Sequence, residues 1–412
     1  MCTMFKDYLT ATPRVEWLPS FDPKPEAGWE GVKALWYESA PYQGKKTKVF
    51  AYMGVPEVKP GEKVPAVVLV HGGGGHAFAH WVKLWNDRGY AAISMDNTGF
   101  FPHPDYKGLT GNEKGPNEVY VTELYGELVE EGYACGPAGS GMRDVEDTPL
   151  EEQWMYHAVA DTILANNILR ADERIDTEKI GIMGVSWGGV ITSITLGHDD
   201  RYAFAIPVYG SAYLEEGPES LAFSDLFRTA QARKYWCATD HIAQVKVPAL
   251  WECYLSDVSF CPIGNSRTYL DTKGNGSIFS CQEKLSHGHW PAWAHEYSYR
   301  FADCILSGKK PLVVPVDEPC GVGEVSFSIS IPEDFTDVQA QLFYMNEPYR
   351  YDPETRALLT PYFCREAVVA ENVVTVDVPN TAYSYYVELS GCVNGVRLLS
   401  STSIVLPNGT DK

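Results

Sequence analysis

Short apolar runs recur between residues 66 and 286 of the chain, and segments with helical periodicity separate several of them. We predict buried strands at residues 66–71, 91–95, 179–185, 203–208, 249–255 and 277–286. We predict helices at residues 78–88, 149–170 and 293–306. This alternation of strands and helices indicates an α/β fold, with a mostly parallel sheet and helices on both faces.

Local signals refine two parts of this pattern. Residues 31–38 and 47–55 alternate in the manner of a β-hairpin, with the turn at residues 43–46. For the helix at 149–170 we predict Thr148 as N-cap, with Pro149 in the first turn and Glu151 completing a capping box.

Two insertions interrupt the α/β pattern. Residues 97–147 form a long polar excursion rich in Gly and Pro. Because structureless connections of that length are usually functional, we predict that this insertion is a lid over the binding pocket. Residues 210–245 are predicted to form a helical insertion.

The pattern changes after residue 310. Only strands are predicted from there on, separated by turn residues: 325–331, 337–344, 373–379, 383–389 and 396–405. About a hundred residues with this rhythm indicate a small β-sandwich. We therefore expect two domains, with the α/β domain at 1–310 and the sandwich at 311–412.

Composition excludes several classes of function. The 412 residues carry a formal net charge of −21, which argues against nucleic acid or an anionic membrane surface as partner. No apolar run is long enough to span a bilayer, and residues 1–7 do not begin a signal peptide, so we expect a cytoplasmic protein. The ten cysteines are scattered without C-x-x-C or zinc spacing, and we expect neither a metal nor an organic cofactor.

A serine stands where a strand is predicted to give way to a helix. Residues 184–188 read Gly-Val-Ser-Trp-Gly, which places Ser186 in a G-x-S-x-G frame. A nucleophilic serine on such a strained turn requires small residues two positions before and after it, and Gly184 and Gly188 meet that requirement. The alternative is an ordinary turn between strand and helix.

A second motif strengthens the interpretation of Ser186 as a nucleophile. The strand at 66–71 ends in His71 and is followed by four glycines, residues 72–75. Glycines leave the approach of a substrate oxygen open, and we expect the N–H groups of Gly73 and Trp187 to form an oxyanion hole. Gly74 and Trp290 are expected to contact the substrate.

A serine nucleophile also needs a base and an acid, which follow it in the order acid and then histidine in α/β-hydrolases. Asp257 comes directly after the strand at 249–255 and is our choice for the acid. Two histidines, His287 and His289, follow the strand at 277–286, and the pattern alone does not separate them. We favour His287 as base because it lies closer to the strand end, with His289 as the alternative.

In combination these motifs resemble the branch of the α/β-hydrolases that contains dienelactone hydrolases and acetyl xylan esterases. The resemblance covers residues 30–310 and is carried by residues 71–75, 89–93, 96, 154–157, 184–189, 199–201 and 287–289. The tail resembles the β-sandwich that follows the hydrolase domain in some of these proteins. In two respects the chain differs, since dienelactone hydrolases carry Cys at the position of Ser186 and the insertion after residue 99 diverges.

The resemblance implies a serine esterase that acts on small acyl groups, acetyl above all, attached to carbohydrate. Its partner would then be a small-molecule or oligosaccharide ester. Two alternatives remain open at this point. One is a peptidase of the prolyl-oligopeptidase type, although no β-propeller is predicted, and the other is a non-catalytic carbohydrate-binding protein.

Overall fold

A computed structural model describes residues 4–407, apart from 24–27, 100, 103–124, 127–130, 138–141, 143–144, 218–222, 353 and 356. Only the backbone is described for residues 101–102 and 125–126, which form the short strands β6 (Phe101–Pro102) and β7 (Tyr125–Gly126). Most of the insertion at 97–147 therefore lies outside the described residues. Its role as a lid stays a prediction.

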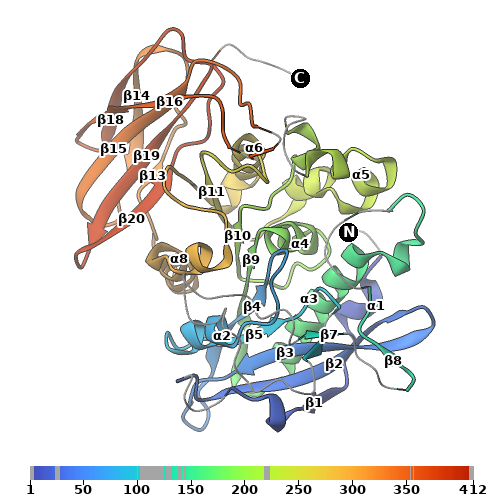
Figure 1. Ribbon diagram of the computed structural model, residues 1–412. Coiled ribbons are helices and arrows are strands. Elements are labelled where there is room, and N and C mark those ends of the chain that lie inside the picture. The colour runs from blue at the N-terminus through green and yellow to red at the C-terminus, as the bar shows by residue number, and fades with distance from the viewer. Residues whose placement is uncertain are drawn as a thin grey trace.

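A parallel sheet forms the centre of the molecule (Figure 1). Its strands lie side by side in the order β5 (Ala91–Met95), β4 (Val64–Val70), β9 (Ile175–Val185), β10 (Phe204–Val208), β11 (Leu250–Tyr254) and β12 (Ile278–Gln282). Every residue of β5, β10, β11 and β12 is buried. Continuous apolar runs suit these strands because helices cover both faces of a parallel sheet.

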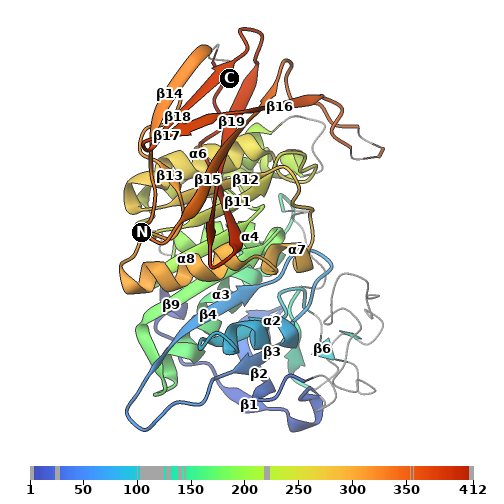
Figure 2. The same ribbon diagram turned by 90° about the vertical axis from the view of Figure 1, so that its left-hand side faces the viewer.

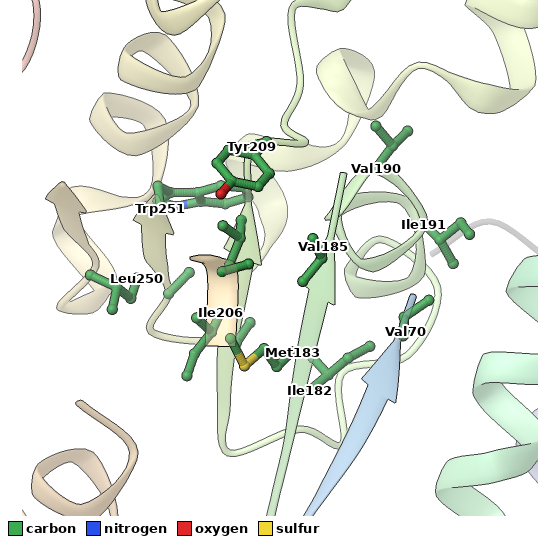
Figure 3. Packing of buried hydrophobic residues seen from close by; sticks show 14 of the residues in the cluster. Val70, Ile182, Met183, Val185, Val190, Ile191, Ile206, Tyr209, Leu250 and Trp251 are labelled. Atoms are coloured by element: carbon green, nitrogen blue, oxygen red, sulfur yellow. The ribbon is translucent and has the colours of Figure 1, made fainter. Parts of the chain in front are cut away.

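Helices pack on both sides of this sheet, as predicted. Figure 1 shows α2 (Ala79–Asn86) and α8 (Glu296–Ser307) on one side, and α3 (Trp154–Ala171) and α4 (Trp187–Leu196) on the other. Aromatic pairs join the helices within each layer. The rings of Trp85 and Tyr299 lie 4.8 Å apart between α2 and α8. Figure 3 shows how side chains of the central strands, among them Val70, Met183, Ile206 and Leu250, fill the space between the layers.

The remaining helices are short or peripheral. They are α1 (Lys6–Leu9), α5 (Ala230–Trp236), α6 (Pro262–Thr272) and α7 (His289–Trp293). The predicted helical insertion at 210–245 contains α5 together with several 3₁₀ turns. None of the helices described has the length and apolar character that a bilayer crossing requires.

Antiparallel strands extend the sheet at its N-terminal edge. The order is β1 (Val15–Trp17), β2 (Val32–Tyr42) and β3 (Lys45–Gly54), with β3 next to β5 and the short β8 (Tyr133–Ala134) also paired with β3. The hairpin between β2 and β3 is longer than predicted. Its turn consists of Gln43 and Gly44, which both adopt positive φ angles.

The C-terminal region forms two antiparallel sheets, which matches the predicted second β region. One contains β13 (Val314–Pro315), β14 (Gly323–Ser330), β18 (Val373–Val378) and β17 (Val368–Ala370). The other contains β20 (Val396–Ser401), β19 (Ser384–Val393), β15 (Thr336–Met345) and β16 (Tyr362–Glu366). Along β14, buried and less buried positions alternate, as expected for a strand with one face on a core.

The second of these sheets is continuous with the parallel sheet. Strand β20 pairs with β12 at Phe279 and Ser401, and the Ser401 hydroxyl accepts a hydrogen bond from the Cys281 N–H at 2.9 Å. A single 14-stranded sheet therefore runs through both regions of the described chain. The pairing of β12 with β20 crosses the predicted domain boundary at residue 310. The division into two domains at that residue therefore stays a prediction.

The predicted start of the helix at 149–170 is wrong. Residues Leu150–Glu152 form a 3₁₀ turn, and α3 begins only after Gln153, whose backbone is extended. The Gln153 amide donates hydrogen bonds to the carbonyl oxygens of Val145 and Thr148. These bonds hold the chain in a turn, so Thr148 does not cap the helix.

Candidate active site

Ser186 occupies a sharp turn between β9 and α4, as its sequence motif predicts. Its φ and ψ angles are 59° and −119°, a conformation that non-glycine residues rarely adopt. A side chain at Gly184 would collide with the backbone of Gly188, and one at Gly188 would collide with the end of β4. The two glycines are thus required by close backbone approach, and they allow the serine to project from the end of the sheet.

Ser186, His287 and Asp257 are brought together at the carboxyl ends of their strands. His287 Nε2 lies 2.7 Å from Ser186 Oγ, and His287 Nδ1 lies 3.1 Å from Asp257 Oδ2. Asp257 is fully buried, whereas the His287 side chain is 24% exposed. With the Nδ1 proton directed at the carboxylate, Nε2 presents its lone pair to the serine hydroxyl, which is the arrangement of a nucleophile, a base and an orienting acid.

The Asp257 carboxylate is held in place by its own loop. Its Oδ1 accepts hydrogen bonds from the N–H groups of Ser259 at 2.7 Å and Phe260 at 3.2 Å. These bonds leave Oδ2 directed at His287. The buried charge is therefore satisfied by two backbone donors and one imidazole.

His289, the alternative base, faces the glycine loop instead of Ser186. Its Nε2 accepts a hydrogen bond from the Gly72 N–H at 2.8 Å, so the proton of the neutral ring is on Nδ1. Burial, followed by the neighbouring His71, His76 and His287, lowers the pKa of His289 well below its ordinary value. A neutral His289 thus fixes the position of the loop that follows β4.

The same loop is expected to supply one oxyanion donor. A side chain at Gly72 would lie 2.6 Å from the Val185 carbonyl oxygen and 2.8 Å from Ser186 Cβ, so glycine is required there. The Gly72 N–H is already committed to His289. Gly73 and Gly74 are exposed, and Trp187 is the first residue of α4, where N–H groups have no partner within the helix. Gly73 and Trp187 remain the predicted donors.

His71 stabilises the glycine loop through two hydrogen bonds. Its Nε2 accepts a hydrogen bond from the Asn97 N–H at 3.0 Å, and its Nδ1 donates to the Gly72 carbonyl oxygen at 2.8 Å. Burial lowers the pKa of His71 to about 3, so the ring is neutral. The residue ties the end of β4 to the end of β5.

Tyr209 is part of the site but was not predicted from the sequence. It follows β10, is fully buried and has a positive φ of 71°. Its ring stacks on the His287 imidazole, with the centroids 4.5 Å apart and an interplanar angle of 26°. Its hydroxyl donates a hydrogen bond to the Ser286 carbonyl oxygen at 2.7 Å. The sequence feature that could have indicated this role is the position of Tyr209 directly after a predicted central strand.

An aromatic wall lies beside the triad. The Trp187 ring is 5.2 Å from Phe223, 5.9 Å from Phe227 and 6.1 Å from Phe260, and Phe260 is 6.1 Å from the His287 ring. Phe227 and Phe260 are buried and Phe223 is half-buried. The wall is apolar and lies beside the His287 imidazole.

Trp290, predicted to contact the substrate, lies in a second aromatic stack. It packs on His80 with the centroids 5.5 Å apart, and His80 packs on Trp29 at 5.6 Å. Its contact with substrate and that of Gly74 stay predictions. Within the part of the chain that is described, no group of three or more His, Cys, Asp and Glu side chains is arranged to hold a metal ion.

Comparisons with known proteins show similarity at the level of the fold. The profile of the prolyl oligopeptidase family matches residues 139–218, a segment that contains Ser186 but neither Asp257 nor His287. A search of curated protein sequences gave no significant match. Many solved structures do match.

An acetyl xylan esterase from Paenibacillus sp. R4 aligns over 73% of this chain and 91% of its own, with 17% identity and a TM-score of 0.50. Acetyl xylan esterase 1 from Thermoanaerobacterium sp. JW/SL YS485 aligns over 74% and 92%, with 13% identity and a TM-score of 0.48. The acylaminoacyl peptidase of Pyrococcus horikoshii aligns over 74% of this chain at 19% identity and a TM-score of 0.44, but over only 43% of its own length.

Proposed function

The chain has the predicted α/β-hydrolase fold, and from the site that this fold presents we propose that the protein is a serine esterase. We propose small acyl esters, acetyl above all, on carbohydrate as its substrates. The observation that carries the proposal is the position of His287, which lies within hydrogen-bonding distance of both Ser186 Oγ and Asp257 Oδ2.

In the proposed mechanism Ser186 Oγ attacks the ester carbonyl carbon while His287 Nε2 takes the hydroxyl proton. Asp257 stabilises the imidazolium that forms. The N–H groups of Trp187 and Gly73 stabilise the oxyanion of the tetrahedral intermediate. His287 then returns the proton to the leaving alkoxide, and the alcohol departs from an acyl-enzyme.

Hydrolysis of the acyl-enzyme uses the same groups in reverse. His287 takes a proton from water, and the resulting hydroxide attacks the acyl carbonyl carbon. The second intermediate collapses to the carboxylic acid, and Ser186 regains its proton from His287. Side chains, backbone N–H groups and water supply every step of the proposed mechanism.

The aromatic wall supports a small acyl group. The rings of Trp187, Phe223 and Phe260 contact one another, and Phe260 lies beside the His287 imidazole. An apolar pocket bounded by rings accepts a methyl group but has little room for a long acyl chain. The carbohydrate part of the proposal is supported by the resemblance of the sequence motifs.

A peptidase is the second candidate, since the prolyl oligopeptidase profile matches the segment around Ser186. The same triad could cleave an amide if the leaving amine were bound in the correct position. The third possibility is a non-catalytic carbohydrate-binding protein. The 2.7 Å separation of His287 from Ser186 favours a working nucleophile over this possibility.

Three substrates assayed in parallel distinguish these functions. They are p-nitrophenyl acetate, an acetylated xylo-oligosaccharide and a peptide p-nitroanilide. The proposal predicts hydrolysis of the first two and little of the third. Turnover of the anilide alone supports the peptidase, and turnover of none supports the binding protein.

A further inference from the structure

Residues 346–361 connect β15 to β16, and the described residues on either side of 353–356 pair as a small hairpin. Tyr351 pairs with Leu358 in an antiparallel bridge, and the Leu359 N–H donates a hydrogen bond to the Arg350 carbonyl oxygen at 2.8 Å. Most connections between neighbouring antiparallel strands are far shorter, and long ones usually serve a function. Figure 2 shows this connection on the same side of the molecule as α7, the helix that begins at His289.

The hairpin packs against the loop that carries Asp257. Tyr351 is buried, and its pKa is raised by burial first and then by its neighbours, which include Cys261 and Asp257. The hairpin therefore lies near the loop that carries Asp257.

A groove with a volume of about 540 Å³ lies between the hairpin and the acid loop. Ser256 and Val258, which flank Asp257, line one side together with Tyr254. The other side is lined by residues 357–362. Because both residues that flank the acid belong to the groove, its occupant would lie next to the triad.

Aromatic rings connect the groove to the catalytic histidine. The Tyr254 ring lies edge-on to Tyr209, with the centroids 5.8 Å apart, and Tyr209 stacks on His287. A ligand in the groove is therefore separated from the imidazole by two side chains. This proximity suits a distant part of the same substrate.

The lining is uncharged and mixes apolar side chains with hydroxyl groups. None of the lining residues that the structure describes carries a charged side chain, although charged residues make up 21% of the sequence. Leu359 and Tyr362 are 51% and 39% exposed, so both side chains are accessible to a ligand in the groove. The ring of Tyr362 is fixed because its hydroxyl donates a hydrogen bond to the Glu283 carboxylate at 3.2 Å.

Neutral sugars fit such a lining. A pyranose ring presents apolar C–H faces to aromatic and aliphatic side chains, while its hydroxyl groups at the edge bind serine hydroxyls and water. An anionic or cationic ligand would find no charged partner among the described lining residues. We propose that the groove binds the neutral glycan chain of the substrate, beyond the sugar that carries the ester. The assumption that this glycan belongs to the substrate rests on the proposed function.

Binding of a glycan without an ester tests the groove independently of catalysis. The full chain is titrated with unacetylated xylohexaose by calorimetry, alongside Leu359→Glu and the control Val368→Glu. Val368 is an exposed apolar residue of β17, away from the groove. The wild type and the control should bind alike. Leu359→Glu should bind about tenfold more weakly, because its carboxylate would lose water under the sugar ring. Absent binding, or equal binding by all three proteins, overturns the proposal.

Kinetics then tie the groove to the ester substrate. In Leu359→Glu, kcat/KM for an acetylated hexasaccharide should fall about tenfold relative to kcat/KM for p-nitrophenyl acetate. The cause should be a higher KM for the hexasaccharide. An unchanged ratio contradicts the groove proposal even when the esterase activity itself is present. If no ester is hydrolysed, the proposed function fails, and the calorimetric result still decides the groove. Binding of peptides in place of sugars, or self-association lost in Leu359→Glu, also contradicts the proposal.

Discussion

The phenol ring of Tyr209 lies nearly flat against the imidazole of His287, with the ring centroids 4.5 Å apart. The same tyrosine donates a hydrogen bond from its hydroxyl to the carbonyl oxygen of the preceding residue, Ser286. One side chain therefore restrains both the ring of the proposed base and the backbone that carries it. The positive φ of Tyr209 indicates that the surrounding structure imposes this position.

Tyr209→Phe should lower kcat for p-nitrophenyl acetate by about fivefold with little change in KM, since a hydrogen bond contributes about 1 kcal/mol. The stacked ring remains, but Ser286 loses its donor. Tyr385→Phe provides the control, because Tyr385 is buried in β19 and its hydroxyl has no partner among the described residues. Equal kcat values in the two variants would show that the hydroxyl of Tyr209 does not position the base.

His287→Ala should lower kcat by about 10⁴-fold, because members of a triad act as a unit. His289→Ala should have a milder effect, since His289 accepts a hydrogen bond from Gly72 and does not reach Ser186. Steady-state kinetics on p-nitrophenyl acetate and circular dichroism of both variants provide the measurement. If the His289 variant is the more damaged one while both are folded, His289 is the base.

The aromatic wall should set acyl size. Phe223→Ala should raise the ratio of kcat/KM for p-nitrophenyl butyrate to that for the acetate about tenfold, because each added methylene in an apolar pocket changes binding by about 1 kcal/mol or more. Phe335→Ala, a buried ring in the C-terminal region, is the matched control and should leave the ratio unchanged. A ratio that moves equally in both variants would refute the wall as the determinant.

Glu252 should make stability depend on pH. It is fully buried on β11 beneath the site, and burial raises its pKa to about 8, against the effect of a hydrogen bond from Ser298. Between about pH 4.5 and pH 8 the folded chain holds a proton that the unfolded chain releases. The contribution of Glu252 to stability is therefore complete below this window and is lost as pH rises through it.

Glu252→Gln removes this proton and keeps the shape of the side chain. The difference in Tm between the variant and the wild type should shift in favour of the variant by several degrees, on the order expected for about 3 kcal/mol, from pH 5 to pH 8. Thermal unfolding followed by circular dichroism at the two pH values measures it. A difference in Tm that stays constant with pH would mean that Glu252 is ionised in the folded protein.

Much of the site could be predicted because its residues follow strands. Ser186, Asp257 and His287 all come directly or closely after apolar runs, and the carboxyl ends of parallel strands meet at one edge of the sheet. His287 and His289 could not be separated in this way. Both follow the same strand, and the choice between them depends on the direction in which each side chain leaves the loop.

The features that the sequence did not reveal depend on contacts between distant segments. The role of Tyr209 requires the loop at Ser286, which lies 77 residues further along the chain. The pairing of β12 with β20 joins two edges whose local patterns contain no information about a partner. The start of α3 was misplaced because the Gln153 side chain binds turn carbonyls and competes with helical capping.

The central claim is that Ser186 is the nucleophile of an esterase, and the turnover of p-nitrophenyl acetate by Ser186→Ala tests it most directly. The account predicts that kcat falls by about 10⁴-fold or more relative to the wild type while the fold, followed by circular dichroism, is retained. Turnover near the wild-type rate in a folded Ser186→Ala variant would contradict it.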